Sequence, residues 1–127
     1  MKHAIYPIFL ATLWITASEF IRNELLFKNL WVEHFASKGL KFETTALNGI
    51  LWMVWSFGLA VLMFKLLQKF SFKESLFMAW LPAFWMMWIT VYNLQVLPLN
   101  LLIFAIPLSF FEIWLAGNIL LKYKTKI

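Results

Sequence analysis

Cysteine is absent from this 127-residue chain, and charged residues make up only 13% of it. Without cysteine the protein has no disulfide, no thiol redox centre and no thiolate metal site. This absence excludes the quinone-linked thiol oxidoreductases that have four membrane helices. The few charges accompany 63% hydrophobic residues and a mean hydropathy of +0.78, so little polar surface is left to coat a water-soluble globule. We therefore expect residues 1–127 to form a single integral membrane domain.

Histidine and Gly-rich motifs are also scarce, which removes most cofactor chemistry. The two histidines, His3 and His34, lie outside the long apolar runs, so a membrane b-type haem has no axial ligands. None of the apolar runs carries a central lysine for a retinal Schiff base, and no phosphate loop or metal-binding motif is present. The sequence predicts no cofactor and no metal site.

Four long apolar runs are present instead, at residues 4–21, 47–64, 75–92 and 101–121. A helix rises about 1.5 Å per residue, so each run is long enough to cross a hydrocarbon core of about 30 Å. Only helices and closed barrels satisfy their backbone hydrogen bonds in lipid, and continuous rather than alternating apolar runs indicate helices. The predicted fold class is an all-α membrane protein, a four-transmembrane-helix bundle.

The first run also has the features of a cleaved signal peptide. It begins with the basic Lys2 and contains Thr16-Ala17-Ser18, a weak small-residue cleavage site. We expect the segment to be retained as a membrane anchor.

The net charge of +5 arises from lysines between the apolar runs, where they orient helices, and we expect no nucleic-acid partner. Seven basic residues fall on the side of the two chain ends: Lys2, Lys65, Lys69, Lys73, Lys122, Lys124 and Lys126. Four fall on the other side: Arg22, Lys28, Lys38 and Lys41. Because cytoplasmic loops carry the excess of basic residues, this count predicts that both termini are cytoplasmic.

The first loop, residues 22–45, is too long for a simple turn. Apolar residues recur in it at helical spacing, with Asn23, Lys28 and Glu33 between them. This pattern predicts an amphipathic interfacial helix over about residues 23–37, with Trp31 at headgroup depth. Gly39 is positioned to end that helix.

The most unusual residue is Glu112, an acid near the middle of the fourth run. An acid at the centre of a spanning helix costs about 2.5–3.5 kcal/mol on insertion scales. Ala105, Ser109, Glu112 and Ala116 follow helical spacing, and stripes of small residues mark close helix contacts. We expect Glu112 to face another helix. One interpretation is a protonated carboxyl that donates a hydrogen bond to Ser56 or Thr90.

A second interpretation places Glu112 below a polar pocket that binds protons or a small ligand. Glu19 and Arg22 are three residues apart, which favours an ion pair near the outer end of the first span. That pair is either a simple interfacial salt bridge or part of the pocket. The other candidate binding residues fall at similar depth: Ser109, Asn48, Thr90 and Asn93.

Aromatic side chains recur along the third run at near-helical spacing. They are Phe77, Trp80, Phe84, Trp88 and Tyr92. Such a stripe is typical of packing or lipid contact. Alternatively, Trp80, Phe84, Trp88 and Tyr92 form a wall for a flat apolar ligand such as a quinone, isoprenoid or lipid tail.

Several short motifs lie in the first 40 residues: Leu13-Trp14, the segment from Leu25 to Lys28, Trp31, and Gly39-Leu40. In these motifs the chain resembles an uncharacterised family of small bacterial membrane proteins with four predicted helices. The glycine that this family carries before its lysine is missing here. The resemblance implies four spans and a bacterial inner-membrane location, and it brings no known activity.

These observations leave three functional hypotheses. The first is a non-enzymatic accessory or assembly subunit, whose partners are membrane lipids and either other membrane subunits or further copies of itself. The second is a carrier or binder of protons or a small apolar ligand, with Glu112 at its centre. The third, a lipid-modifying enzyme, is least favoured because only hydroxyls and indoles are expected at the depth of Glu112.

Overall fold

The computed structural model describes residues 2–123. Four helical stretches in this part of the chain are long and apolar enough to cross a membrane: His3–Leu26, Ala46–Lys69, Phe72–Asn93 and Leu99–Leu121. The predicted fold class, an all-α membrane protein with four spanning helices, is therefore confirmed.

Two of the spans contain π-helical segments, which the sequence analysis did not predict. The first and third spans are each divided in this way: α1 (Lys2–Phe20) continues as the π-helix η1 (Ile21–Leu26), and α4 (Phe72–Trp80) continues through the π-helix η2 (Leu81–Trp85) into α5 (Met86–Asn93). The remaining elements are α2 (Lys28–Ser37), α3 (Ala46–Lys69), the 3-10 turn η3 (Leu99–Leu101) and α6 (Leu102–Leu121).

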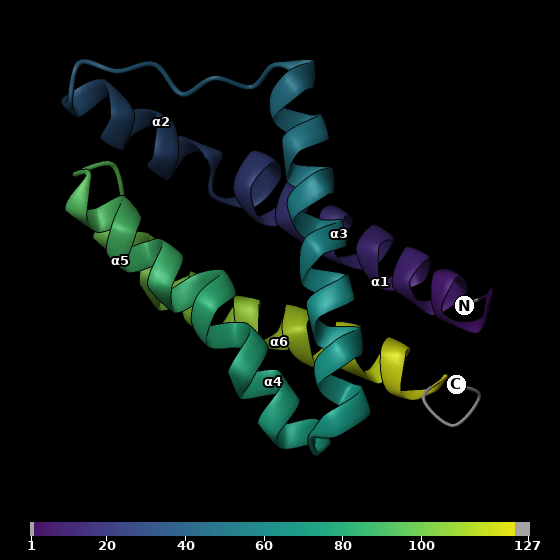
Figure 1. The fold of residues 1–127 in the computed structure, drawn as a ribbon. Coiled ribbons are helices and arrows are strands. Elements are labelled where there is room, and N and C mark those ends of the chain that lie inside the picture. Colours follow the sequence, from purple (N-terminus) through teal and green to yellow (C-terminus); the bar gives the residue numbers. More distant parts are fainter. Residues whose placement is uncertain (1, 124–127) are drawn as a thin grey trace.

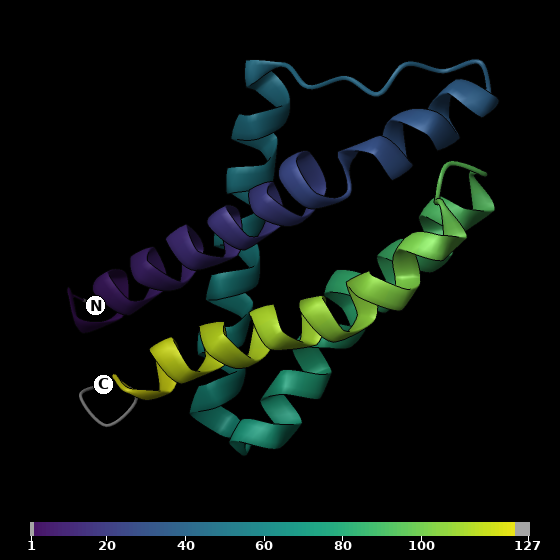
Figure 2. The ribbon, with the colours of Figure 1, turned by 180° about the vertical axis from the view of Figure 1, so that it is seen from behind.

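Helices α1 and α6 run side by side, and α3 crosses them at a steep angle (Figures 1 and 2). The first and last helices bring the chain ends together, since the rings of Tyr6 and Tyr123 lie 5.6 Å apart. This arrangement fits an even number of spans. The cytoplasmic placement of the ends stays a prediction, and the lysines counted at 124 and 126 lie outside the described residues, as does the side chain of Lys2.

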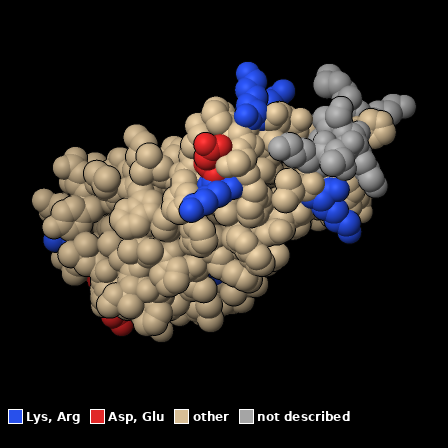
Figure 3. Space-filling view, turned by 90° about the horizontal axis from the view of Figure 1, so that it is seen from below, with Lys and Arg blue, Asp and Glu red and all other residues tan. Residues whose placement is uncertain are grey.

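The surface of the bundle is largely apolar. Figure 3 shows a broad face with few charged residues, on which lysine and arginine gather toward the chain ends. The core includes side chains of α1, α3 and α6 that are fully buried, among them Ala11, Ile15, Ala60, Met63, Ile113 and Ala116. The small alanines let the helices approach closely.

The first loop contains the predicted helix, but this helix begins later than expected, at Lys28. Gly39 ends α2 as predicted, with a φ of +72° that favours glycine. The amide of Gly39 donates to the carbonyl of Ala36, and that of Leu40 donates to Phe35, which is the usual pattern of a glycine-terminated helix. That α2 lies at the membrane interface stays a prediction.

Gly117 lies where α6 packs closely against α4. A Cβ atom at this position would lie 2.9 Å from side-chain atoms of both Leu76 and Phe72. We expect Gly117→Val to destabilise the bundle by about 1–3 kcal/mol, because both neighbours would have to move. Titration with sodium dodecyl sulfate, followed by circular dichroism, would measure the change.

Gly58 on α3 provides the matched control, since a Cβ there meets nothing within 4 Å. Gly58→Val should leave the free energy of unfolding nearly unchanged. Equal losses at the two glycines would show that helix propensity, and not contact with α4, sets the effect.

Candidate functional site

Glu19 and Arg22 lie inside the bundle and not at its surface. Helix α1 continues as η1 beyond the predicted end of the first span, so these residues stay within a spanning helix. Glu19 is 3% exposed and Arg22 is 6% exposed. The guanidinium Nη2 of Arg22 donates to Oε1 of Glu19 at 2.5 Å. The predicted ion pair is present, and both of its residues line a pocket, as in the second of its two interpretations.

Glu112 faces α1 from α6 and is fully buried. The predicted stripe forms a buried face, because Ala105, Ser109 and Ala116 are also at most 2% exposed. The indole Nε1 of Trp14 donates to the backbone carbonyl of Glu112 at 2.9 Å, which ties α1 to α6 at this level. The acid therefore lies at a helix–helix contact, as expected.

The carboxyl group of Glu112 has no hydrogen-bond partner of normal length among the described residues, for either oxygen. Predicted bonds to Ser56 and Thr90 are not formed: both hydroxyls donate to backbone carbonyls of their own helices, at 2.8 and 2.9 Å. The charged groups that act on Glu112 are Glu19 and Arg22. The expectation that only hydroxyls and indoles share its depth is therefore wrong.

A chain of hydrogen bonds links this buried cluster to α2. Asn23 Nδ2 donates to Oε2 of Glu19 at 2.9 Å, and Trp31 Nε1 donates to Oδ1 of Asn23 at 3.1 Å. Asn23 lies four residues after Glu19, so helical spacing was a signal for this contact that our sequence analysis did not use. The position of α2 thus depends on a buried acid of α1.

The two π-helical segments meet at the guanidinium of Arg22. Its Cζ atom lies 5.4 Å from the ring centre of Phe84, which belongs to η2 and is fully buried. An aromatic face attracts a cation through its quadrupole. Single-turn π-helices often mark functional sites, because the extra residue redirects side chains. Here each segment supplies one side of the contact: η1 contributes Arg22, and η2 contributes Phe84.

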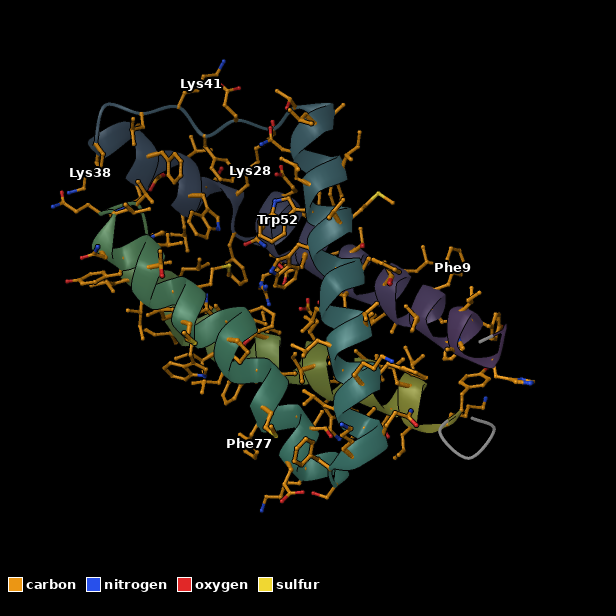
Figure 4. The ribbon with its side chains drawn as sticks, in the orientation of Figure 1. Phe9, Lys28, Lys38, Lys41, Trp52 and Phe77 are labelled. Atoms are coloured by element: carbon orange, nitrogen blue, oxygen red, sulfur yellow. The ribbon has the colours of Figure 1, made fainter. Side chains whose placement is uncertain are left out.

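A pocket of about 450 Å³ adjoins this cluster between α1, α2, α3 and α5. Glu19, Arg22 and Asn23 are among its polar residues, and Trp31, Trp52 and Trp88 contribute aromatic walls. In Figure 4, Trp52 projects from α3 toward the end of the first span, whereas Lys41 points away from the bundle. A smaller hollow of about 270 Å³ shares Glu19, Asn23 and Trp52. Trp52 was not predicted as a site residue.

Of the other predicted polar residues, only Asn48 lines either hollow. Asn48 lines the pocket, but its Oδ1 also accepts from the backbone amide of Thr45 at 2.9 Å and thereby caps α3. Ser109 bridges two spans, because its hydroxyl accepts from Trp80 Nε1 at 2.9 Å and donates to the carbonyl of Ile106. Thr90 and Asn93 are exposed and line neither of these hollows.

The aromatic residues of the third span do not form one continuous wall. Phe84 and Trp88 are buried, Trp80 is half-buried, and Tyr92 is 56% exposed. Their rings pack mainly on one another, with 5.8 Å between the ring centres of Phe84 and Trp88. Of the four, only Trp88 lines the 450 Å³ pocket. Packing, the first interpretation of this stripe, therefore accounts for most of it.

Among residues 2–123, no three His, Asp or Glu side chains are grouped closely enough to hold a metal ion. The site therefore consists of a buried pair of acids with one arginine, next to an aromatic pocket. Its chemistry suits proton exchange and the binding of organic molecules.

Comparison with protein-family models, with curated proteins and with solved structures finds no match to this chain. The resemblance to a family of small bacterial membrane proteins thus stays a prediction. The chain can be assigned to a class of architecture, namely a membrane-type bundle of four apolar helices.

Proposed function

We propose that this protein is a non-catalytic membrane binder of a small amphipathic molecule, held in the pocket beside Glu19 and Arg22. The observation that carries the proposal is the combination of a pocket of about 450 Å³ with buried charged groups and three tryptophans in its lining. Binding pockets for small molecules are typically about 300–1,000 Å³, with mostly apolar walls and a few polar groups. This pocket has both properties.

The buried charges support binding over a purely structural role. An ion pair inside a bundle contributes little stability compared with well-packed apolar residues, since both charges lose their water. Ionisable residues within membrane spans usually mark pathways or sites. Glu19 and Arg22 line the pocket, and the charges of both residues also act on Glu112.

The hypothesis of an accessory subunit stays a prediction without an observation of its own. Large apolar side chains are exposed along α3, among them Leu47, Ile50, Val54 and Phe57. Such residues suit lipid and a protein partner equally well. The pocket, in contrast, gives the binding proposal a defined location.

Filling the pocket tests the proposal. Val91 on α5 lines the pocket and is partly buried, so Val91→Phe would occupy part of its volume. We expect saturable binding of 1-aminoanthracene, a flat amphipathic fluorophore, to weaken at least about tenfold in this variant. Energy transfer from tryptophan to the probe in lipid nanodiscs, corrected with empty nanodiscs, would report the binding.

Ile89→Phe provides the control, because Ile89 lies on the same helix but is 67% exposed. This variant should bind the probe like the unmodified protein. Absence of saturable binding in the unmodified protein, or an equal loss in both variants, would contradict the proposal.

A further inference from the structure

The buried cluster contains one more acid than base. Glu19 and Glu112 are both almost fully buried, and Arg22 is the one cation that acts on Glu112 among the described residues. When both carboxyls are ionised, the cluster therefore carries one net negative charge within the spanning helices. An unpaired charge in such surroundings is strongly unfavourable, so one further positive charge is required.

The hydrogen bonds of the cluster are also incomplete. Arg22 uses Nη2 for Glu19, but its Nη1 is buried without a partner. Both oxygens of Glu112 are likewise buried without a hydrogen-bond partner of normal length, although Glu19 and Ser18 are near them. A second cation beside Glu19 would leave Arg22 available to Glu112, which would pair two acids with two cations.

Space for such a cation lies beside Glu19, because Glu19 lines both of these hollows and Glu112 lines neither. The other charged residues of the lining are Glu24, Lys41 and Glu43, and Lys28 beside the pocket brings their total charge to zero. Glu24 forms an ion pair with Lys28 at 3.5 Å, and Lys41 and Glu43 are exposed residues of opposite charge. The charged residues of α3 and α4 are Lys65, Lys69, Lys73 and Glu74, and none of them lines the pocket.

The walls of the pocket indicate which cation fits. Five aromatic residues line it: Trp31, Phe35, Phe42, Trp52 and Trp88. Aromatic faces bind organic cations well, quaternary ammonium groups in particular. The pocket volume of about 450 Å³ is also that of an organic molecule and far exceeds a bare metal ion.

We propose that the pocket takes a lipophilic organic cation, and that this cation replaces one proton shared by Glu19 and Glu112. The inference rests on the proposed binding function and names its ligand class. Charge is balanced in the exchange: the cation enters, one carboxyl O–H bond breaks, and the proton leaves to water. Afterwards the cation lies beside Glu19, and Arg22 pairs with Glu112.

Calorimetric titration with benzyltrimethylammonium chloride tests this exchange. The protein is studied in phosphatidylcholine nanodiscs, in two buffers of different ionisation enthalpy, so that the difference in heat counts released protons. We expect release of about one proton per bound cation, and binding that strengthens as pH rises, because protons compete with the cation. Binding without proton release would overturn the inference.

Glu112→Gln keeps the shape of the side chain but removes one acid. Its cluster is neutral with Arg22 alone, so the cation should bind at least about tenfold more weakly and release no proton. Glu19→Gln should abolish proton release as well, and it serves as a second variant should the first not fold. Glu33→Gln, which changes an exposed acid of α2 outside the pocket, should behave like the unmodified protein.

Neopentylbenzene, the uncharged isostere of the probe, separates charge recognition from simple apolar binding. It should not displace benzyltrimethylammonium, and equal competition by the two molecules would overturn the cation assignment. If 1-aminoanthracene binds and the cation does not, this inference fails while the proposed function stands. If neither binds, the proposed function fails as well.

Discussion

Replacing Arg22 by methionine is expected to destabilise the bundle by about 3–5 kcal/mol, the usual cost of removing one partner from a buried ion pair. The substitution leaves Glu19 and Glu112 buried together without a cation. It also removes the contact between the guanidinium and the ring of Phe84. Titration with sodium dodecyl sulfate in mixed micelles, followed by circular dichroism, would measure the loss.

Lys28→Met is the matched control for this experiment. Lys28 also forms an ion pair with an acid on a neighbouring turn, Glu24, but 42% of its side chain is exposed. Exposed pairs contribute about 0.2–1 kcal/mol, so this variant should be nearly as stable as the unmodified protein. Similar losses for both variants would mean that Arg22 is not in a distinct buried environment.

Truncation of Phe84 is the second large effect that we expect. Phe84 is fully buried in η2, between the guanidinium of Arg22 and the rings of Trp55 and Trp88. Phe84→Ala should destabilise the bundle by about 3 kcal/mol, at the lower end of values for buried phenylalanine. The lower end applies because lipid tails solvate the phenylalanine ring in the unfolded state, so burial of the ring gains little free energy. The remaining loss comes from the cavity that the substitution leaves in the core.

Phe77 supplies the comparison within the same span, since it is 47% exposed. Phe77→Ala should change the free energy of unfolding much less, because lipid can fill the space of the missing ring. Equal losses at Phe77 and Phe84 would show that the π-helical segment has no special role in the core. Both variants can be measured by the same titration.

The four spans and the buried face of Glu112 could be predicted from sequence because each depends on one local pattern. Long apolar runs predict spanning helices whatever the tertiary contacts are. Ala105, Ser109 and Ala116 are small residues on the face of Glu112, and small faces pack against helices. Gly39 was likewise predicted to end α2 from its type and place alone.

The neighbours of Glu112 could not be predicted in this way. The apolar run predicted that the first span ends at residue 21, with Arg22 in the following loop, whereas the helix continues as η1 to Leu26. A π-helical segment adds a residue to a turn without any reliable sequence signal. This continuation keeps Arg22 inside the bundle, where its charge acts on Glu112.

The second π-helical segment explains why the third span was only partly understood. A regular helix from Phe77 to Tyr92 would place their rings on one face, but η2 interrupts that register. Phe84 and Trp88, at and beyond this segment, are buried, whereas Tyr92 lies in the last turn of α5 and is exposed. Thr90 is exposed on the same helix, and so it does not reach the pocket where depth alone had placed it.

The most direct test asks whether Arg22 and Glu112 act as one electrostatic unit. A double-mutant cycle would combine Arg22→Met with Glu112→Gln and compare the four free energies of unfolding. We predict that the loss caused by Arg22→Met shrinks by at least about 1 kcal/mol when Glu112 is already glutamine, because fewer acids are then left unpaired. Additive effects, within about 0.5 kcal/mol, would contradict a shared buried cluster.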